Sequence, residues 1–194
     1  ESDIVIRRSR FFRNGGGDGY THNLYVGAVR SLTVTGSWLW GADVGHELKS
    51  RAATTTIVGN YIDDADATAS YSVDLPNGGL ALVAGNVVVQ GPRSENSTLV
   101  SYGAEGLSNA SHRLWVVHNT FVNRRSSGTF VSLAAGSRAT LRNNLLVGPG
   151  DLTAGAAASA RANRRVGAGS FVDAAPGDFH LMVSSPAVDR GVRV

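Results

Sequence analysis

Short apolar segments recur along the chain, and each is followed by a small polar residue or asparagine, one spacer and another apolar residue. In one copy, the apolar run Thr56-Ile57-Val58 is followed by Asn60, one spacer and the apolar Ile62. The equivalent polar positions, separated by 28, 23, 26, 33 and 25 residues, are Ser9, Ser37, Asn60, Asn86, Asn119 and Asn144. Self-similarity at this period is typical of a solenoid. No helical period joins the segments, so the repeat predicts strands.

A second strand is predicted ahead of each polar position. Its apolar residues, at intervals of 24, 25, 27 and 30, are Leu24, Leu48, Val73, Val100 and Phe130. We therefore predict an all-β fold, a right-handed parallel β-helix (β-solenoid) of about seven to eight coils with three parallel sheets. The positions expected to be buried are Leu24, Leu48, Val73, Ile57, Val83, Val116 and Leu141.

The recurring polar residue has a structural explanation. The chain must turn sharply between strands, and asparagine tolerates the left-handed conformation better than most residues. Stacked coils would place these amides roughly 4.8 Å apart, close enough to hydrogen-bond along the axis. The inward apolar side chains would stack in the same way into one continuous core.

Composition narrows the class of protein. The 194 residues are 42% hydrophobic, and no apolar run approaches the roughly 18 residues of a membrane span. Cysteine is absent, which excludes disulfides and thiolate chemistry. The 18 basic residues are all arginine except Lys49, and their bunches are scattered without interleaved aromatics. Nucleic-acid binding is therefore not predicted, although a mild attraction to acidic polymers is.

We expect a single domain over residues 1–194, with residues 170–194 as a terminal coil. The first strand, at Ile4–Ile6, has no amphipathic capping helix before it. An uncovered sheet end invites aggregation, so we expect a fragment whose first coil is covered by further coils or by another chain. The Ala-rich stretch Ala154–Arg165 is compatible with a short helix or an irregular excursion.

The phrase Val117-His118-Asn119-Thr120-Phe121 resembles the right-handed β-helices of the pectin-lyase-like superfamily, and so do the other asparagine turns. The closing stretches, 170–181 and 185–191, resemble the last coil of secreted bacterial members. The resemblance implies a secreted or periplasmic bacterial protein with a saccharide groove on its outer surface. The superfamily includes lyases, epimerases, hydrolases and non-enzymatic surface proteins, so it leaves the activity open.

Most of the candidate functional side chains are predicted on the outward face of the second strands. If Leu24, Leu48 and Val73 point inward, the residues between them form an outward row on successive coils, namely Tyr25, Lys49 and Asp74. Period-two alternation puts Glu47 and Arg51 on the face of Lys49. Other candidates, which follow in the next coils or precede the strands, are Asn77, Tyr102, Glu105, His22 and His46.

Such a surface suits an acidic polysaccharide. Lys49 and Arg51 could bind a uronate carboxylate and stabilise the enolate formed when the adjacent proton is removed. Lys49 or Tyr25 could be the base, a choice that the resemblance supports, because lyases of this superfamily use Arg, Lys, His or Tyr in such roles. We assign catalysis to Lys49, Arg51, Tyr25 and His46, and substrate binding to Asp74, Asn77, His22, Tyr102 and Glu105.

Structural explanations compete with this assignment. The charged row could be a solvated salt-bridge ladder of Glu47, Lys49, Arg51 and Asp74. The two histidines could simply hydrogen-bond backbone carbonyls. Lys49 is the only lysine in an arginine-rich chain, which favours a need for a compact ammonium, although chance also explains it.

No cofactor or metal site is predicted. Asp63, Asp64 and Asp66 share one loop, which leaves calcium open, but their spacing does not match a known loop and a solvated acidic turn explains them as well. Only Asp74 lies on the outward face, which argues against a hydrolase. The leading hypothesis is a lyase or C5-epimerase acting on a uronate-containing polymer. The alternatives are a non-catalytic surface, adhesin or carbohydrate-binding β-helix, and a scaffold for a catalytic region encoded elsewhere.

Overall fold

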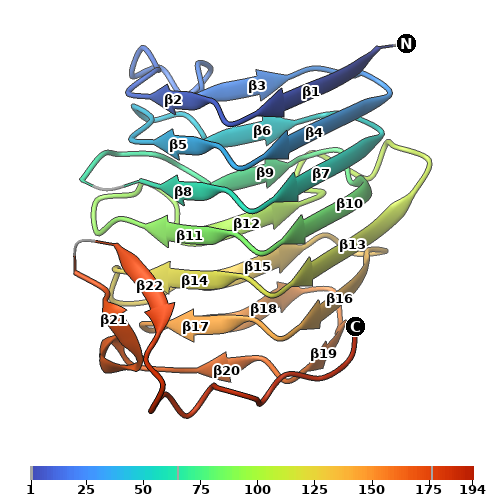
Figure 1. Ribbon diagram of the computed structural model, residues 1–194. Helices are drawn as coiled ribbons and strands as arrows, with labels where there is room; N and C mark the ends of the chain where they lie inside the picture. The colour runs from blue at the N-terminus through green and yellow to red at the C-terminus, as the bar shows by residue number, and fades with distance from the viewer. Residues whose placement is uncertain (1, 65, 176) are drawn as a thin grey trace.

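The chain winds into a right-handed parallel β-helix of about seven coils. The structure, a computed structural model, describes residues 2–64, 66–175 and 177–194. Each coil contributes strands to three stacked parallel sheets, and strands succeed one another in chain order along every sheet (Figure 1). The predicted fold class is therefore confirmed. Among the described residues, no helix has the length and apolarity that crossing a membrane requires.

Each of the three parallel sheets takes one strand from each successive coil. The first sheet comprises β1 (Asp3–Arg7), β4 (Ser31–Thr35), β7 (Thr54–Val58), β10 (Gly79–Ala84), β13 (His112–Val117), β16 (Arg138–Arg142) and β19 (Ala158–Arg161). The second comprises β2 (Arg10–Phe12), β5 (Trp38–Trp40), β8 (Tyr61–Asp63), β11 (Val87–Gln90), β14 (Thr120–Asn123), β17 (Leu145–Val147) and β20 (Arg164–Arg165). The third comprises β3 (Leu24–Val26), β6 (Leu48–Ser50), β9 (Val73–Leu75), β12 (Thr98–Tyr102), β15 (Thr129–Leu133) and β18 (Asp151–Gly155).

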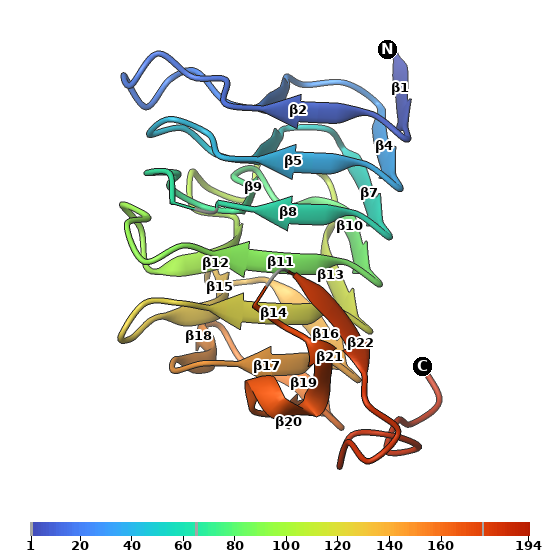
Figure 2. The same ribbon diagram turned by 60° about the vertical axis from the view of Figure 1, so that its left-hand side comes forward.

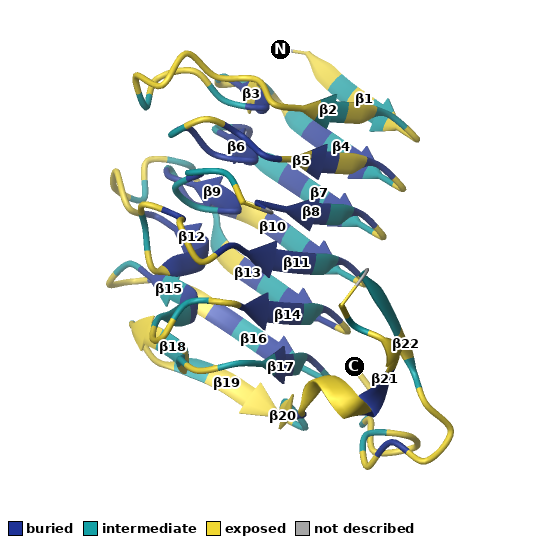
Figure 3. Cartoon of the chain, turned by 90° about the vertical axis from the view of Figure 1, so that its left-hand side faces the viewer, coloured by how far each residue is buried: buried dark blue, intermediate teal, exposed yellow. Residues whose placement is uncertain are grey.

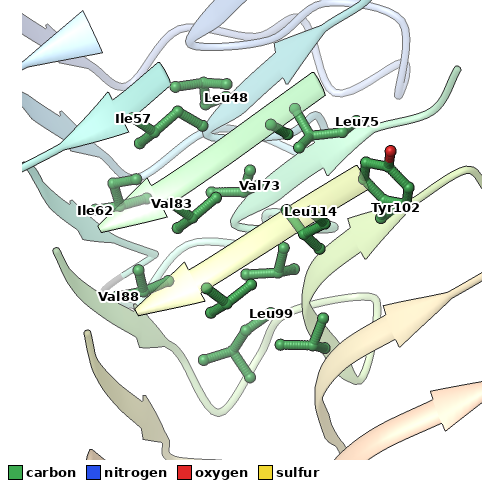
Figure 4. Close-up of a cluster of buried hydrophobic side chains, with 14 of the residues drawn as sticks. Leu48, Ile57, Ile62, Val73, Leu75, Val83, Val88, Leu99, Tyr102 and Leu114 are labelled. Atoms are coloured by element: carbon green, nitrogen blue, oxygen red, sulfur yellow. The ribbon is translucent and has the colours of Figure 1, made fainter. Parts of the chain in front are cut away.

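The core is a column of inward side chains from all three sheets (Figure 4). All seven positions predicted to be buried are buried. The register along the third sheet differs from the expected one at a single step, because Val100 pairs with Val131 rather than with Phe130. Phe130 and Val131 are both fully buried, so the one-residue difference leaves no apolar side chain exposed at this step.

The recurring asparagines form a hydrogen-bonded ladder inside the coil. The backbone N–H of Asn60 donates to Asn86 Oδ1 at 2.9 Å, and the N–H of Asn86 donates to Asn119 Oδ1 at 3.0 Å. Each side-chain amide also donates to the next Oδ1, at 3.0 Å for Asn60 and 2.9 Å for Asn86. The ladder continues through Asn144 to Asn163, which the repeat did not predict. The predicted stacking of amides is confirmed.

We expected the asparagine to be the left-handed residue of each turn. In the structure, the residue before the asparagine has this conformation. Gly59 has φ +64° and Gly85 has φ +63°, a region that glycine enters without steric cost. His118 and Asn143 take the same position with φ +57°. The asparagine instead points inward and supplies the hydrogen bonds that hold the turn together.

The C-terminal region departs from the expected architecture. Residues 154–165, expected to be a helix or an irregular excursion, form the end of β18, the strands β19 and β20, and the short turns between them. Residues 170–194 do not add a parallel coil. After a short 3₁₀ helix, η1 (Ala168–Ser170), strands β21 (Phe171–Asp173) and β22 (Asp178–Leu181) pair antiparallel and fold back over the outside of the solenoid (Figure 2).

This hairpin docks on the second sheet. Gly177 lies against Tyr61 on β8, since a Cβ added to this glycine would be 2.6 Å from the tyrosine hydroxyl. Beyond the hairpin, Asn143 Nδ2 donates to Val192 O at 2.7 Å and Val192 N donates back to Asn143 Oδ1 at 2.8 Å. The C-terminal segment therefore contacts the solenoid at two places along its axis, at Tyr61 of β8 and at Asn143 between β16 and β17.

Candidate functional site

The third sheet is buried on both sides over its middle coils. Every residue of β6, β9 and β12 is buried, whereas β18 at the far end is largely exposed (Figure 3). Tyr25 pairs with Lys49, and Lys49 pairs with Asp74, so the predicted outward row exists. Its Lys49 side chain is only 11% exposed. Something therefore covers this outward face.

The cover is Glu105, which follows β12 and reaches back over two coils. Its Oε1 accepts a hydrogen bond from Lys49 Nζ at 2.8 Å, and its Oε2 accepts one from Arg51 Nη2 at 2.5 Å. The Glu105 side chain remains 45% exposed. Lys49, Arg51 and Glu105 together are called the carboxylate clamp below. The hydrogen bond from Lys49 lowers the pKa of Glu105, and the bond to Glu105 raises the pKa of Arg51.

Polar neighbours orient the two cations. Asp74 Oδ2 lies 3.3 Å from Lys49 Nζ, beneath the clamp. Arg51 donates from Nε to Tyr25 Oη at 3.1 Å and from Nη1 to Asn77 Oδ1 at 2.6 Å. Burial raises the pKa of Asp74, and the adjacent ammonium opposes this rise. With both carboxylates ionised, two positive charges balance two negative ones.

His22, His46 and Tyr71 form a stacked column beside the clamp. The rings of His22 and His46 are 4.7 Å apart, and those of His46 and Tyr71 are 5.2 Å apart. His22 Nδ1 accepts from the backbone N–H of His46 at 3.0 Å, and His46 Nδ1 accepts from that of Tyr71 at 3.2 Å. These bonds go to backbone amides rather than to the carbonyls that we expected. Their role is to hold the turns in register.

His46 is neutral at physiological pH. Burial, followed by the neighbouring His22 and Lys49, lowers its pKa to about 3. Because Nδ1 is occupied as an acceptor, the ring proton is on Nε2, which faces Asp74 Oδ2 at 3.4 Å. Burial also lowers the pKa of His22. Both ring nitrogens of His46 face protein groups, and His22 Nδ1 is occupied by the backbone of His46, so the proposed chemistry below uses neither histidine.

Two residues expected on the outward face are not there. Tyr102 is 1% exposed and points into the core, where its hydroxyl donates to Gly79 O at 2.5 Å. Burial raises its pKa to about 12. Glu47 is fully buried under the turn after β5, where it accepts hydrogen bonds from Asn23 Nδ2 and from Ala42 N. Neither can contact a ligand at the clamp. Glu47 also lies outside the row of salt bridges that the sequence suggested for Glu47, Lys49, Arg51 and Asp74.

The three aspartates of the predicted acidic loop do not share one environment. Asp64 is buried and accepts hydrogen bonds from Ser94 Oγ, Ala69 N and Gly91 N. Burial raises its pKa to about 6. Asp63 accepts from the hydroxyl of Tyr61 at 3.2 Å, and Asp66 is exposed. Within the described residues, no group of three or more His, Asp or Glu side chains could hold a metal ion.

A second group of exposed side chains, not predicted from the sequence, lies on the outer face of β2 and β5. Trp38 is 55% exposed and Trp40 is 39% exposed, with the buried Leu39 between them. The signal was present in the sequence, because period-two alternation sends both tryptophans outward when Leu39 points inward.

No protein-family model, curated protein or solved structure matches this chain. The class of protein is therefore defined by its own geometry. The chain is a right-handed parallel β-helix that holds a half-exposed carboxylate between two cations on its third sheet.

Proposed function

We propose that this chain is a polysaccharide-binding β-helix of the pectin-lyase-like type, exported from a bacterial cell, whose clamp recognises a uronate carboxylate. The observation that carries the proposal is the convergence of Lys49 and Arg51 on the two oxygens of one half-exposed carboxylate, that of Glu105. Hydrogen bonds between two charged groups suit a carboxylate, whereas a neutral sugar offers these cations only uncharged oxygens.

Glu105 occupies the position that a substrate carboxylate would take. Because the cluster is already balanced in charge, an incoming uronate would replace Glu105 rather than add to it. Asp74 would keep Lys49 charged and oriented during the exchange, since their contact lies beneath the clamp. Asn77 and Tyr25, both in contact with Arg51, are placed to bond sugar hydroxyls.

β-Elimination or C5 epimerisation is the second candidate, favoured by the position of Tyr25. Its side chain is 51% exposed, and its hydroxyl lies 3.1 Å from Arg51 Nε. Lys49 is held by two carboxylates, so Tyr25 is the better proton acceptor of the two. As the phenolate, stabilised by the Arg51 guanidinium, Tyr25 would take the proton beside the bound carboxylate and become the neutral phenol, while the cations stabilise the enolate. In elimination, the bond to the neighbouring glycosidic oxygen then breaks, and this oxygen takes the proton from the Tyr25 phenol. In epimerisation, the enolate instead takes a proton from water on the opposite face.

Lys49→Arg tests whether the clamp needs an ammonium. The guanidinium is larger and planar and cannot fit between Asp74 and Glu105 in the same way. We expect the melting temperature to change little, whereas affinity for polygalacturonate or alginate falls about tenfold, or more if Lys49 acts in catalysis. Affinity electrophoresis measures the binding, and ultraviolet absorbance of unsaturated products measures elimination. A variant equal to its parent in both would reduce Lys49 to a rung of a salt-bridge ladder.

Glu105→Gln tests the exchange from the other side. Glutamine keeps the size of the side chain but removes the internal competitor for the two cations. We expect uronate polymers to bind about threefold to tenfold more tightly, with the gain lost at high salt. Glu95→Gln, a change of an exposed glutamate in the turn between β11 and β12, outside the clamp, serves as the control. Weaker binding by Glu105→Gln would show that Glu105 contacts the ligand instead of making way for it.

A further inference from the structure

The second surface lies on the outer face of the second sheet, over its first three strands. Two rows of side chains run along the axis, in the register Arg10–Trp38–Tyr61 and Phe12–Trp40–Asp63. The rings of Trp38 and Tyr61 are 5.5 Å apart, and those of Phe12 and Trp40 are 6.1 Å apart. The C-terminal hairpin covers this sheet farther along the axis and leaves β2 and β5 open (Figure 2). Exposed aromatic groups in such number mark an interaction surface.

Trp40 lies between two hollows of this surface. One, of about 230 Å³, is lined by Arg10, Phe11, Phe12, Trp38 and Trp40. The other, of about 440 Å³, is formed with the adjacent turns, and the side chains that line it include Arg13, Trp40, Asp43, Asp66, Thr68 and Arg93. The indole therefore forms a wall common to both, and one extended ligand can contact it in each hollow.

The polar groups of the larger hollow are available to a ligand. Arg13 stacks its guanidinium 5.3 Å from the centre of the Trp40 ring. Asp43 accepts one hydrogen bond, from Thr68 Oγ1 at 3.0 Å. Within the described part of the chain, Arg13, Arg93 and Asp66 form no salt bridge. The clamp differs in this respect, because its charges are already paired.

We propose that this surface is a second saccharide-binding site, centred on Trp40 and distinct from the clamp. The C–H face of a sugar ring packs against indole, while planar guanidinium and carboxylate groups bond the ring hydroxyls as donors and acceptors. Aromatic walls with a few convergent polar groups are the usual composition of a ligand site. The mixture of Asp43 and Asp66 with Arg13 and Arg93 disfavours a nucleic acid, because the carboxylates would repel its phosphates.

The site does not depend on the function proposed for the clamp, because the two lie on different sheets. The same turns nevertheless connect them. Arg13, Asp43 and Thr68 line the hollow from three successive turns, and these turns lead to His22, His46 and Tyr71 beside the clamp. A long polysaccharide could therefore occupy both.

Trp40→Ala provides the test, with Trp115→Ala as the matched control. Trp115 is the third tryptophan of the chain and lies on the first sheet, away from both sites. Affinity electrophoresis in gels that contain polygalacturonate, alginate or xylan measures binding by the parent and both variants. We expect the parent to be retarded by at least one polymer, Trp40→Ala to bind it about tenfold more weakly, and Trp115→Ala to match the parent.

Several results would overturn the proposal. They are a parent that no polymer in the panel retards, a Trp40→Ala variant that binds like the parent, and a parent dimer in sedimentation analysis that Trp40→Ala dissociates. The last would identify the surface as a contact between copies of this chain. Arg51→Ala, measured in parallel, separates the two sites. A loss confined to uronate polymers in Arg51→Ala concerns the clamp, whereas a loss on xylan in Trp40→Ala concerns this surface alone.

Discussion

Asn86→Ala is expected to lower the free energy of unfolding by about 3–5 kcal/mol, because it removes the central rung of the ladder. Asn86 Oδ1 accepts from Asn60 N and Asn60 Nδ2, and Asn86 Nδ2 donates to Ile57 O and Asn119 Oδ1. Asn86 is 1% exposed, so water cannot replace these partners. Each buried group left unsatisfied costs about 1–3 kcal/mol. Urea denaturation followed by far-ultraviolet circular dichroism measures the loss.

Asn163→Ala is the matched control at the end of the ladder. Asn163 also accepts from the amide of Asn144 and donates to Leu141 O, but it is only partly buried. Water can reach the groups that it would leave, so we expect a loss of about 1 kcal/mol. Equal losses for Asn163→Ala and Asn86→Ala would contradict the view that burial gives the ladder its strength.

Stability is expected to fall by about 2 kcal/mol between pH 6.5 and pH 8.5 because of Glu47. Burial raises the pKa of Glu47 from 4.5 to about 8. The folded state then holds a proton that the unfolded state has already released, so stability declines as pH rises from the unfolded to the folded pKa. The opposite effects of His46, whose folded pKa is about 3, and of His22, whose folded pKa is also lowered, end about one pH unit above the unfolded histidine pKa of about 6.5. Above about pH 7.5 these effects and that of Asp64, whose folded pKa is about 6, have ended, so the remaining decline belongs to Glu47.

Glu47→Gln should remove the decline. The glutamine oxygen can still accept from Ala42 N, while the neutral amide has no proton to lose. The measurement is the free energy of unfolding at several pH values, and the decisive quantity is its slope, because the substitution can also shift the curve as a whole. A variant with the slope of its parent would assign the pH dependence to another group. Glu105→Gln is a suitable comparison, because the pKa of Glu105 is lowered and contributes no slope in this range.

The alternation of apolar and polar residues determined the architecture, because each coil repeats the same inward and outward positions. Alternation set Leu24, Leu48 and Val73 inward, so the register of Tyr25 with Lys49 followed. The amide ladder was predictable for the same reason, since a one-step shift would expose a whole row of apolar side chains. Alternation alone also places Tyr102 inward, with Val100, and assigning it to the surface segment before Glu105 overlooked this.

Only the tertiary structure decided where the turns between strands go. The turn after β5 folds over Glu47, which the local alternation places outward, and buries it against Ala42 and Asn23. The turn after β12 carries Glu105 across two coils to Lys49, a residue 56 positions away in the sequence. Turns of variable length have no period from which their path can be read, and their contacts involve distant coils. The sequence by itself therefore determined the solenoid and the outward row, whereas the paths of the turns decided which of those side chains a ligand can reach.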